Sequence, residues 1–164
     1  MKIEIVTSDL SAAFIASVME NAPDAVHVYD KFHVAKLVNE AVDAVRKNVY
    51  AQEADLEKRK IIKGSRWLLL TKDKDIFDDE KKKRLDNILE TNTPIFHAYY
   101  LREDLDQIWM QDSKEEAERQ LAYWCERARE TKLKPFIKVA NTLMARRTGI
   151  LAWYDAPVTN AMLE

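Results

Sequence analysis

The sequence has few of the residues that disulfide-stabilised, β-rich or membrane-spanning proteins need. Its single cysteine, Cys125, excludes an internal disulfide and fits a reducing compartment. Only two glycines, Gly64 and Gly149, and four prolines occur, too few for the many turns of a β-sandwich or barrel. No apolar run approaches the ~20 residues of a membrane helix, and the N-terminus has no signal-peptide apolar core. We therefore expect a cytoplasmic protein without membrane contact.

The sequence also lacks an excess of one charge sign. It contains 26 lysines and arginines against 28 aspartates and glutamates, so its overall charge gives no evidence for nucleic-acid binding. Hydrophobic residues make up 47% and charged residues 33%, a composition that excludes a disordered chain and suits amphipathic helices. The 164 residues fit one domain, or one domain with an appendage.

The first thirty residues predict a strand–helix–strand unit. Residues 2–7 alternate as a strand does, and residues 25–29 form a second strand. Between them, a serine or aspartate within Ser8–Ser11 caps a helix that ends near Asn21. The two strands should be parallel. Such a sheet is not viable alone, so either further strands are supplied elsewhere or the chain is cut from a longer one.

From residue 31 onward the pattern is helical. An apolar stripe at three- and four-residue spacings predicts one helix from residue 31 to about residue 60. Cap residues predict helix starts at Asp78 or Asp79, at Thr93-Pro94 and at Ser113-x-x-Glu116. A final long helix is expected over residues 135–147, ended by Gly149, and Cys125 is expected in the core. The predicted fold class is mostly α (α+β): a short N-terminal βαβ unit with a two-stranded parallel sheet, then a helical bundle-like region.

Two aspartates, Asp9 and Asp30, follow the two predicted strands. Carboxylates at the carboxyl ends of adjacent parallel strands can share a crevice and attract a divalent cation; the alternative is that each only caps a helix. His33 lies three residues after Asp30, which puts acid and imidazole on one face of a first helical turn, unless it is merely a surface histidine. His27 and His97 have no partner at zinc-ligand spacing and are expected to be structural.

Several strings of the sequence resemble one protein family. They are Ser8–Ser11, Pro23–Ala25, Tyr29–Val34, Leu37–Ala41, Lys63–Leu69 and Gly149–Tyr154, followed by Thr159-Asn160 and Glu164. In order and spacing they resemble the catalytic core of bacterial insertion-sequence transposases of the ISL-three group. The resemblance covers nearly the whole chain, and its most specific part is the string Asp30-Lys31-Phe32-His33.

The resemblance implies a ribonuclease H-like core with a DDE triad of acids that cleaves and transfers DNA strands with Mg²⁺ or Mn²⁺. Asp9 matches the second acid and Glu164 the third, while Asp30 and His33 match a companion acid-and-histidine motif. A different register would make Asp30 the second metal-binding acid. No residue matches the first acid, so we expect a truncated chain that is inactive in isolation and need not bind metal itself.

The resemblance also divides the chain. Residues 1–35 would be a partial ribonuclease H-like unit, residues 36–156 a helical insertion domain and residues 157–164 the start of the final core helix. The insertion is expected to position DNA, namely the transposon ends, or a partner subunit. Its candidate phosphate contacts are Lys63, Arg66, Arg146 and Arg147, unless these are only solubilising charges. Trp67 and Trp153 are expected in the core rather than as base-stacking residues.

Two other functions stay open at this point. One is a non-enzymatic helical module that binds DNA or protein and uses the βαβ piece only as a scaffold. The other is a small metal-dependent hydrolase built on Asp30 and His33, which lacks a visible third ligand. An exposed edge strand on the short sheet could also pair with another copy of the chain, which would make a homo-oligomer.

Overall fold

The N-terminal region forms the expected strand–helix–strand unit. The computed structural model describes residues 4–8 and 11–155. In it β1 (Ile5–Ser8), α1 (Ala12–Asn21) and β2 (Val26–Tyr29) follow one another, and the two strands pair in parallel with Ser8 opposite Tyr29. Ser11 is the N-cap of α1, since its side chain accepts a hydrogen bond from the Phe14 N–H at 3.3 Å. The first strand ends one residue later than predicted, at Ser8, and Glu4, which was predicted to lie in it, precedes its start at Ile5.

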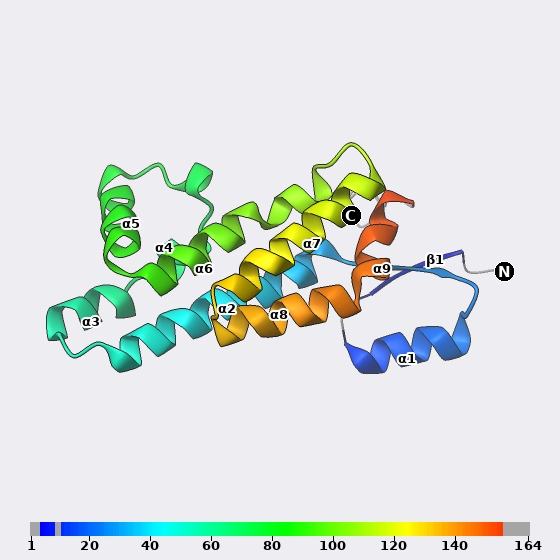
Figure 1. Cartoon of the computed structure of the whole chain (residues 1–164), viewed down its shortest axis with the longest axis horizontal. Helices are drawn as coiled ribbons and strands as arrows, with labels where there is room; N and C mark the ends of the chain where they lie inside the picture. Colours follow the sequence, from blue (N-terminus) through cyan, green and yellow to red (C-terminus); the bar gives the residue numbers. More distant parts are fainter. Residues whose placement is uncertain (1–3, 9–10, 156–164) are drawn as a thin grey trace.

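Helices form the rest of the described chain. They are α2 (Lys31–Gln52), α3 (Leu56–Lys63), α4 (Arg66–Leu70), α5 (Asp79–Thr91), α6 (Thr93–Asp104), α7 (Lys114–Glu130), α8 (Lys134–Ala145) and α9 (Arg147–Leu151), with 3₁₀ turns η1 (Asp73–Asp75), η2 (Leu105–Trp109) and η3 (Ala152–Tyr154). The long helices α2, α6, α7 and α8 pack into an elongated body, with α3 and α5 at one end and the sheet at the other (Figure 1). The predicted fold class is confirmed.

The expected single helix from residue 31 to about residue 60 is wrong. The helix α2 ends at Gln52, and α3 begins at Leu56. The cause is Asp55, whose carboxylate accepts hydrogen bonds from the N–H groups of Glu57 and Lys58 at 2.9 and 3.0 Å. An aspartate that caps a new first turn stabilises the start of a second helix. This stabilisation outweighs the burial that one continuous helix would gain from its apolar stripe.

The other predicted helix starts are close to those observed. Asp78 caps α5 through the Lys81 N–H at 3.0 Å, and Ser113 caps α7 through the Glu116 N–H at 3.2 Å. The start of α6 is shifted, because Asn92, and not Thr93, is its N-cap.

The core lies between the long helices. Val34, Val38 and Val42 of α2 are buried, as the stripe predicted. Trp124 of α7 is wholly buried, and its indole N–H donates to the Leu101 carbonyl of α6 at 2.8 Å. Cys125 beside it is also buried, as expected, and burial raises the pKa of its thiol to about 11.

The expected role of Gly149 as a helix stop is wrong. The helix α8 ends at Ala145, and Gly149 lies inside α9, where it is buried. A Cβ atom at this position would lie 2.2 Å from Cε2 of Tyr29. Gly149 is therefore needed for close approach, because only a hydrogen atom fits between α9 and the ring that β2 contributes.

Candidate functional site

Asp30 and His33 lie together where β2 passes into α2. Asp30 is the N-cap of α2: its Oδ1 accepts a hydrogen bond from the Phe32 N–H at 2.8 Å. Its Oδ2 lies 3.4 Å from His33 Nδ1, and the two side chains are 31% and 44% exposed. The spacing therefore brings acid and imidazole together as predicted, within reach of solvent, and the capping alternative for Asp30 is confirmed as well.

The end of β1 lies beside this pair. The Asp30 N–H donates to the Ser8 carbonyl at 3.1 Å, and the buried Ser8 side chain is hydrogen-bonded to Nε2 of His27. Burial, and then the positive charge of Arg146, lower the pKa of His27. His27 thus has the structural role expected of it. Asp9 follows Ser8 directly in sequence, but Asp9 and Glu164 both lie outside the described residues.

A complete metal site does not form within residues 4–8 and 11–155, where no three histidine, cysteine, aspartate or glutamate side chains gather. Asp30 and His33 offer a carboxylate and an imidazole, but Asp30 Oδ1 already accepts the hydrogen bond from the Phe32 N–H. In the described part of the chain, a hydrolase site built on this pair has no third ligand.

Lys63 and Arg66, two of the candidate phosphate contacts, are exposed at the junction of α3 and α4. Arg66 Nε lies 3.6 Å from the carboxylate of Asp43, which also pairs with Arg46 at 2.8 Å and Lys47 at 3.0 Å. Burial raises the pKa of Asp43, but hydrogen bonds from Arg46 and Lys47 outweigh burial and hold that pKa below its usual value. One buried carboxylate thus anchors three cations from α2 and α4.

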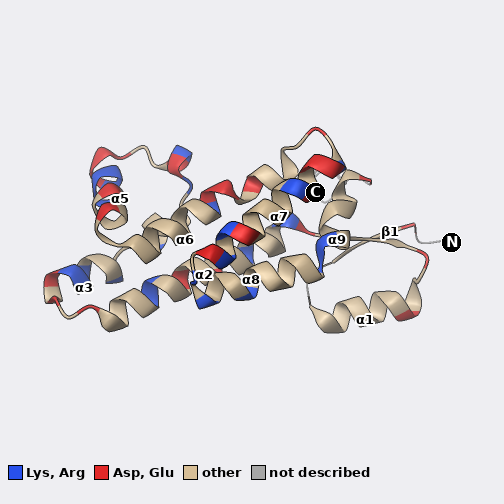
Figure 2. Cartoon of the chain, in the orientation of Figure 1, with Lys and Arg blue, Asp and Glu red and all other residues tan. Residues whose placement is uncertain are grey.

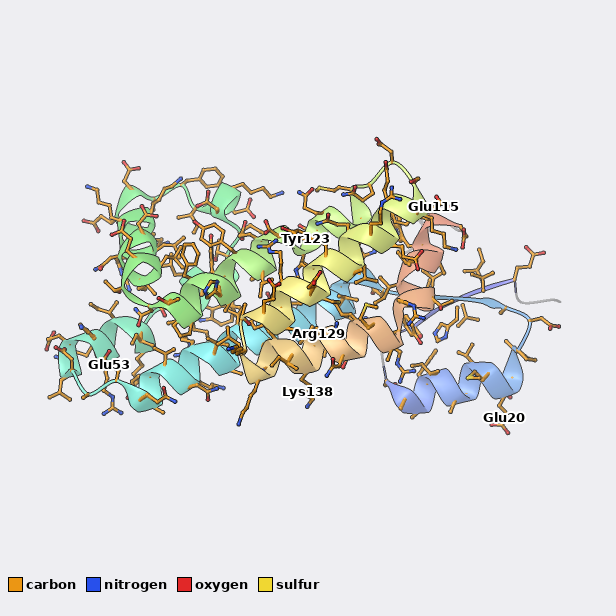
Figure 3. The ribbon with its side chains drawn as sticks, in the orientation of Figure 1. Glu20, Glu53, Glu115, Tyr123, Arg129 and Lys138 are labelled. Carbon is orange, nitrogen blue, oxygen red and sulfur yellow. The ribbon has the colours of Figure 1, made fainter. Side chains whose placement is uncertain are left out.

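The other two candidates, Arg146 and Arg147, lie at the junction of α8 and α9, and α9 packs against β2. Arg147 is exposed, and Arg146 lines a groove along α8 together with Lys134 and Lys138. The described residues that line this groove include these three cations and no acid. Lys138 projects from α8 (Figure 3). Lys134 and Lys138 were not predicted as phosphate contacts. Their four-residue spacing, and the further eight residues to Arg146, place all three on one helix face.

The four predicted phosphate contacts therefore form two groups, one beside the sheet and one at the far end of the helical body (Figure 1). Figure 2 shows that lysine and arginine alternate with acids on α5, whereas α8 carries mainly basic residues among its charged ones. Of α5 and α8, the helix α8 therefore has the positive charge that fewer acids on the same helix compensate.

The expectation that Trp67 belongs to the core is wrong. Its side chain is 72% exposed, whereas Leu69 on the same short helix is 1% exposed. The helix α4 turns Leu69 inward, which leaves Trp67 on the outer side with the Arg66 guanidinium carbon 4.8 Å from its ring centroid. Trp153 is half-buried and packs against the core, in line with the prediction.

The amino-acid sequence matches one protein family. The family model DDE_Tnp_ISL3, described as "Transposase", matches residues 1–164. The chain belongs to this ISL3 transposase family.

The chain is similar to named members of the family. It is 33% identical over 165 residues to the transposase of insertion sequence element IS1001 from Bordetella parapertussis, which covers 99% of this chain and 40% of that protein. It is 25% identical over 177 residues to the transposase of insertion sequence element IS1557 from Mycobacterium tuberculosis, over 94% of this chain and 39% of that protein. The chain thus spans about two-fifths of the curated relatives it matches. No solved structure matches it.

Among the described residues, no helix combines the length and apolarity that crossing a bilayer requires.

Proposed function

We propose that this chain is the part of a DDE-type transposase that carries the second and third catalytic acids and a helical insertion. The family match over residues 1–164 carries the proposal. Asp9 and Glu164 are the proposed metal-binding acids, and Asp30 with His33 forms the companion motif beside them. Residues 36–156 form the insertion, between a partial ribonuclease H-like unit at residues 1–35 and the last core helix from residue 157.

The environment of β1 and β2 supports Asp9 rather than Asp30 as the metal ligand. Asp30 Oδ1 already accepts a hydrogen bond from the Phe32 N–H as the cap of α2, and Oδ2 lies 3.4 Å from His33 Nδ1. Ser11 caps α1, so helix capping gives no reason for an aspartate at position 9. The last described strand pair, Ser8 and Tyr29, precedes Asp9 and Asp30 directly in sequence, which supports a shared sheet edge for these two acids.

Carboxylates suit Mg²⁺ or Mn²⁺, because hard cations prefer oxygen ligands. When bound, such ions activate the attacking oxygen and stabilise the leaving one at a phosphodiester. Asp30 Oδ2 lies 3.4 Å from His33 Nδ1, which is itself buried, so the exposed part of that side chain is the remainder of the ring. This arrangement fits a histidine that is oriented beside the reacting phosphate.

The basic groups supply the DNA contacts in this proposal. Arg146 and Arg147 lie at the junction of α8 with α9, which packs against β2, and Lys134 and Lys138 extend the basic face from there along α8. Lys63 and Arg66 would hold a second stretch of the same DNA. Phosphate contacts of this kind position a duplex without reading its sequence.

The test uses the full-length transposase and the isolated chain. In the full-length protein, Asp9→Asn and Glu164→Gln should each abolish excision of the element, whereas Asp24→Asn, at an exposed acid before β2, should not. Full activity of Asp9→Asn would contradict the assignment. The isolated chain should not nick DNA, because only two of the three acids are matched in it; Mg²⁺-dependent nicking that Asp9→Asn removes would contradict that part.

The alternative function is a non-enzymatic helical module that binds DNA or protein. The observation in its favour is the balanced charge of the chain, with 26 lysines and arginines against 28 aspartates and glutamates. Excision by the full-length protein separates the two: its loss in both Asp9→Asn and Glu164→Gln supports the transposase core, and full excision by both variants supports the module. The homo-oligomer stays a prediction.

A further inference from the structure

Two aromatic side chains stand exposed around one pocket at the end of the molecule far from the sheet. Trp67 of α4 is 72% exposed and Phe77, which precedes α5, is 88% exposed, the two highest values among the described large hydrophobic residues. Both line a pocket of about 350 Å³ that Lys81 and Arg84 of α5 also line. The placement is unfavourable for a chain that only has to fold, because burial of such rings would stabilise it.

The segment that carries Trp67 is held firmly at both ends. At its start, Arg66 pairs with the buried Asp43 at 3.6 Å. At its end, the buried Arg102 of α6 donates to the carbonyls of Leu70 and Thr71. The exposed indole therefore sits on a fixed support, as a preorganised binding surface requires.

The charges around the pocket suit a ligand that carries a neutral ring on an anionic backbone. Asp75 and Asp78 line it along with the two cations, and Asp78 is already engaged as the cap of α5 through the Lys81 N–H. The pocket itself thus contains balanced charge. Lys63 and Arg66 lie immediately beside it on α3 and α4 without a place in its lining.

We propose that this pocket binds an unpaired base of single-stranded DNA. Trp67 and Phe77 supply the stacking surfaces, and Arg66, Lys63 and Arg84 contact the flanking phosphates. The proposal rests on the proposed function, since it requires that the chain meets DNA. Exposed aromatic rings with cations beside them, here in a lining that also holds Asp75 and Asp78, are the pattern that binds single strands without sequence preference. A docked protein element is instead matched by a continuous apolar face.

The test compares two labelled strands of about ten nucleotides, within the usual site size for single-stranded binding. One is oligothymidylate, and the other is an abasic strand of equal length that keeps the phosphates and lacks the bases. By fluorescence anisotropy, the wild-type chain should bind oligothymidylate at least about fivefold more tightly than the abasic strand, since one stacked base contributes that much. Trp67→Ala should bring the ratio close to one with little effect on the abasic strand, and Phe77→Ala should lower it in part.

Three further variants sharpen the result. Lys63→Ala should weaken binding of both strands equally, because it removes a phosphate contact at an exposed side chain, and Trp67→Phe should keep most of the ratio. The matched control is Tyr123→Ala on α7 (Figure 3): Tyr123 is 54% exposed with the Arg127 guanidinium carbon 5.5 Å from its ring centroid, but lies outside the pocket. This variant should leave the ratio unchanged. Circular dichroism checks that every variant is folded.

Each remaining outcome overturns the proposal in a distinct way. If wild type binds both strands equally well, the base pocket is refuted and DNA binding stands. If it binds neither strand nor duplex DNA, the proposed DNA interface fails as well. If the two strands bind equally and the chain self-associates through Trp67, the pocket is an interface between copies.

Discussion

Gly149 gives the most direct test of how α9 is fitted against β2. Replacing it with alanine would put a Cβ atom 2.2 and 2.3 Å from Cε2 and Cδ2 of Tyr29. Carbon atoms in contact prefer about 3.5–4.0 Å, so the ring must move by more than ~1 Å. Tyr29 is buried and precedes Asp30, so it cannot swing freely into solvent. Overpacking of this kind costs about 1–3 kcal/mol.

Urea unfolding followed by circular dichroism measures this cost. The control is Gly64→Ala, because a Cβ atom at that position would meet its nearest neighbour at 3.6 Å, an ordinary contact. We expect Gly64→Ala to change stability by less than about 0.5 kcal/mol. In thermal unfolding, Gly149→Ala should lower Tm by about 2–4 °C for each kcal/mol lost.

A double-mutant cycle identifies the ring as the cause. Tyr29→Val removes the atoms that clash and keeps strand propensity. In that background Gly149→Ala should cost nothing, or stabilise slightly through helix propensity. The explanation is refuted if Gly149→Ala is as mild as Gly64→Ala, or if its cost is the same with and without the Tyr29 ring.

Three further perturbations have predicted results that equilibrium unfolding measures. Ser113→Ala should destabilise by about 1 kcal/mol because α7 loses its cap, and Ser113→Asp should restore most of that. Arg102→Met should cost about 3 kcal/mol, because carbonyls at the end of α4 lose their buried donor; a change below about 1 kcal/mol would contradict this. The Asp43 ion pairs contribute stability that is fully present above the unfolded carboxyl pKa of 3.8 and is lost as pH falls through the depressed folded pKa. Wild type should therefore lose more stability than Asp43→Asn below about pH 4.

The parts of the fold that sequence predicted are those set by neighbouring residues. Ser113, Asp78 and the residues around Asp30 act within one helical turn, so their spacing is enough to predict a helix start. The break after Gln52 was missed because the apolar stripe and the cap at Asp55 indicate different structures, and the capping hydrogen bonds prevail. Gly149 was misassigned because its role depends on Tyr29, which is distant in sequence.

The candidate site was likewise predicted only where residues close in sequence determine the structure. The pairing of Asp30 with His33 follows from a three-residue spacing, and it is observed. The exposure of Trp67 could not be predicted, because the pattern of four apolar residues in Trp67–Leu70 does not say which of them the rest of the fold covers. The basic groove on α8 was visible in spacing, but only the packing of α9 on β2 places Arg146 near the sheet.

Asp30 allows the capping and chemical roles to be separated. Asparagine caps a helix about as well as aspartate, but it carries no charge to pair with His33. In the isolated chain, Asp30→Asn should therefore leave stability within about 0.5 kcal/mol, while Asp30→Ala costs about 1 kcal/mol through the lost hydrogen bond to the Phe32 N–H. In the full-length transposase, both variants should reduce excision strongly if the Asp30 carboxylate and His33 act together in the reaction. Wild-type excision by Asp30→Asn would reduce Asp30 to a helix cap, because asparagine keeps the cap and lacks the carboxylate. Loss of excision in Asp30→Asn with unchanged stability would mean that the carboxylate charge itself is needed.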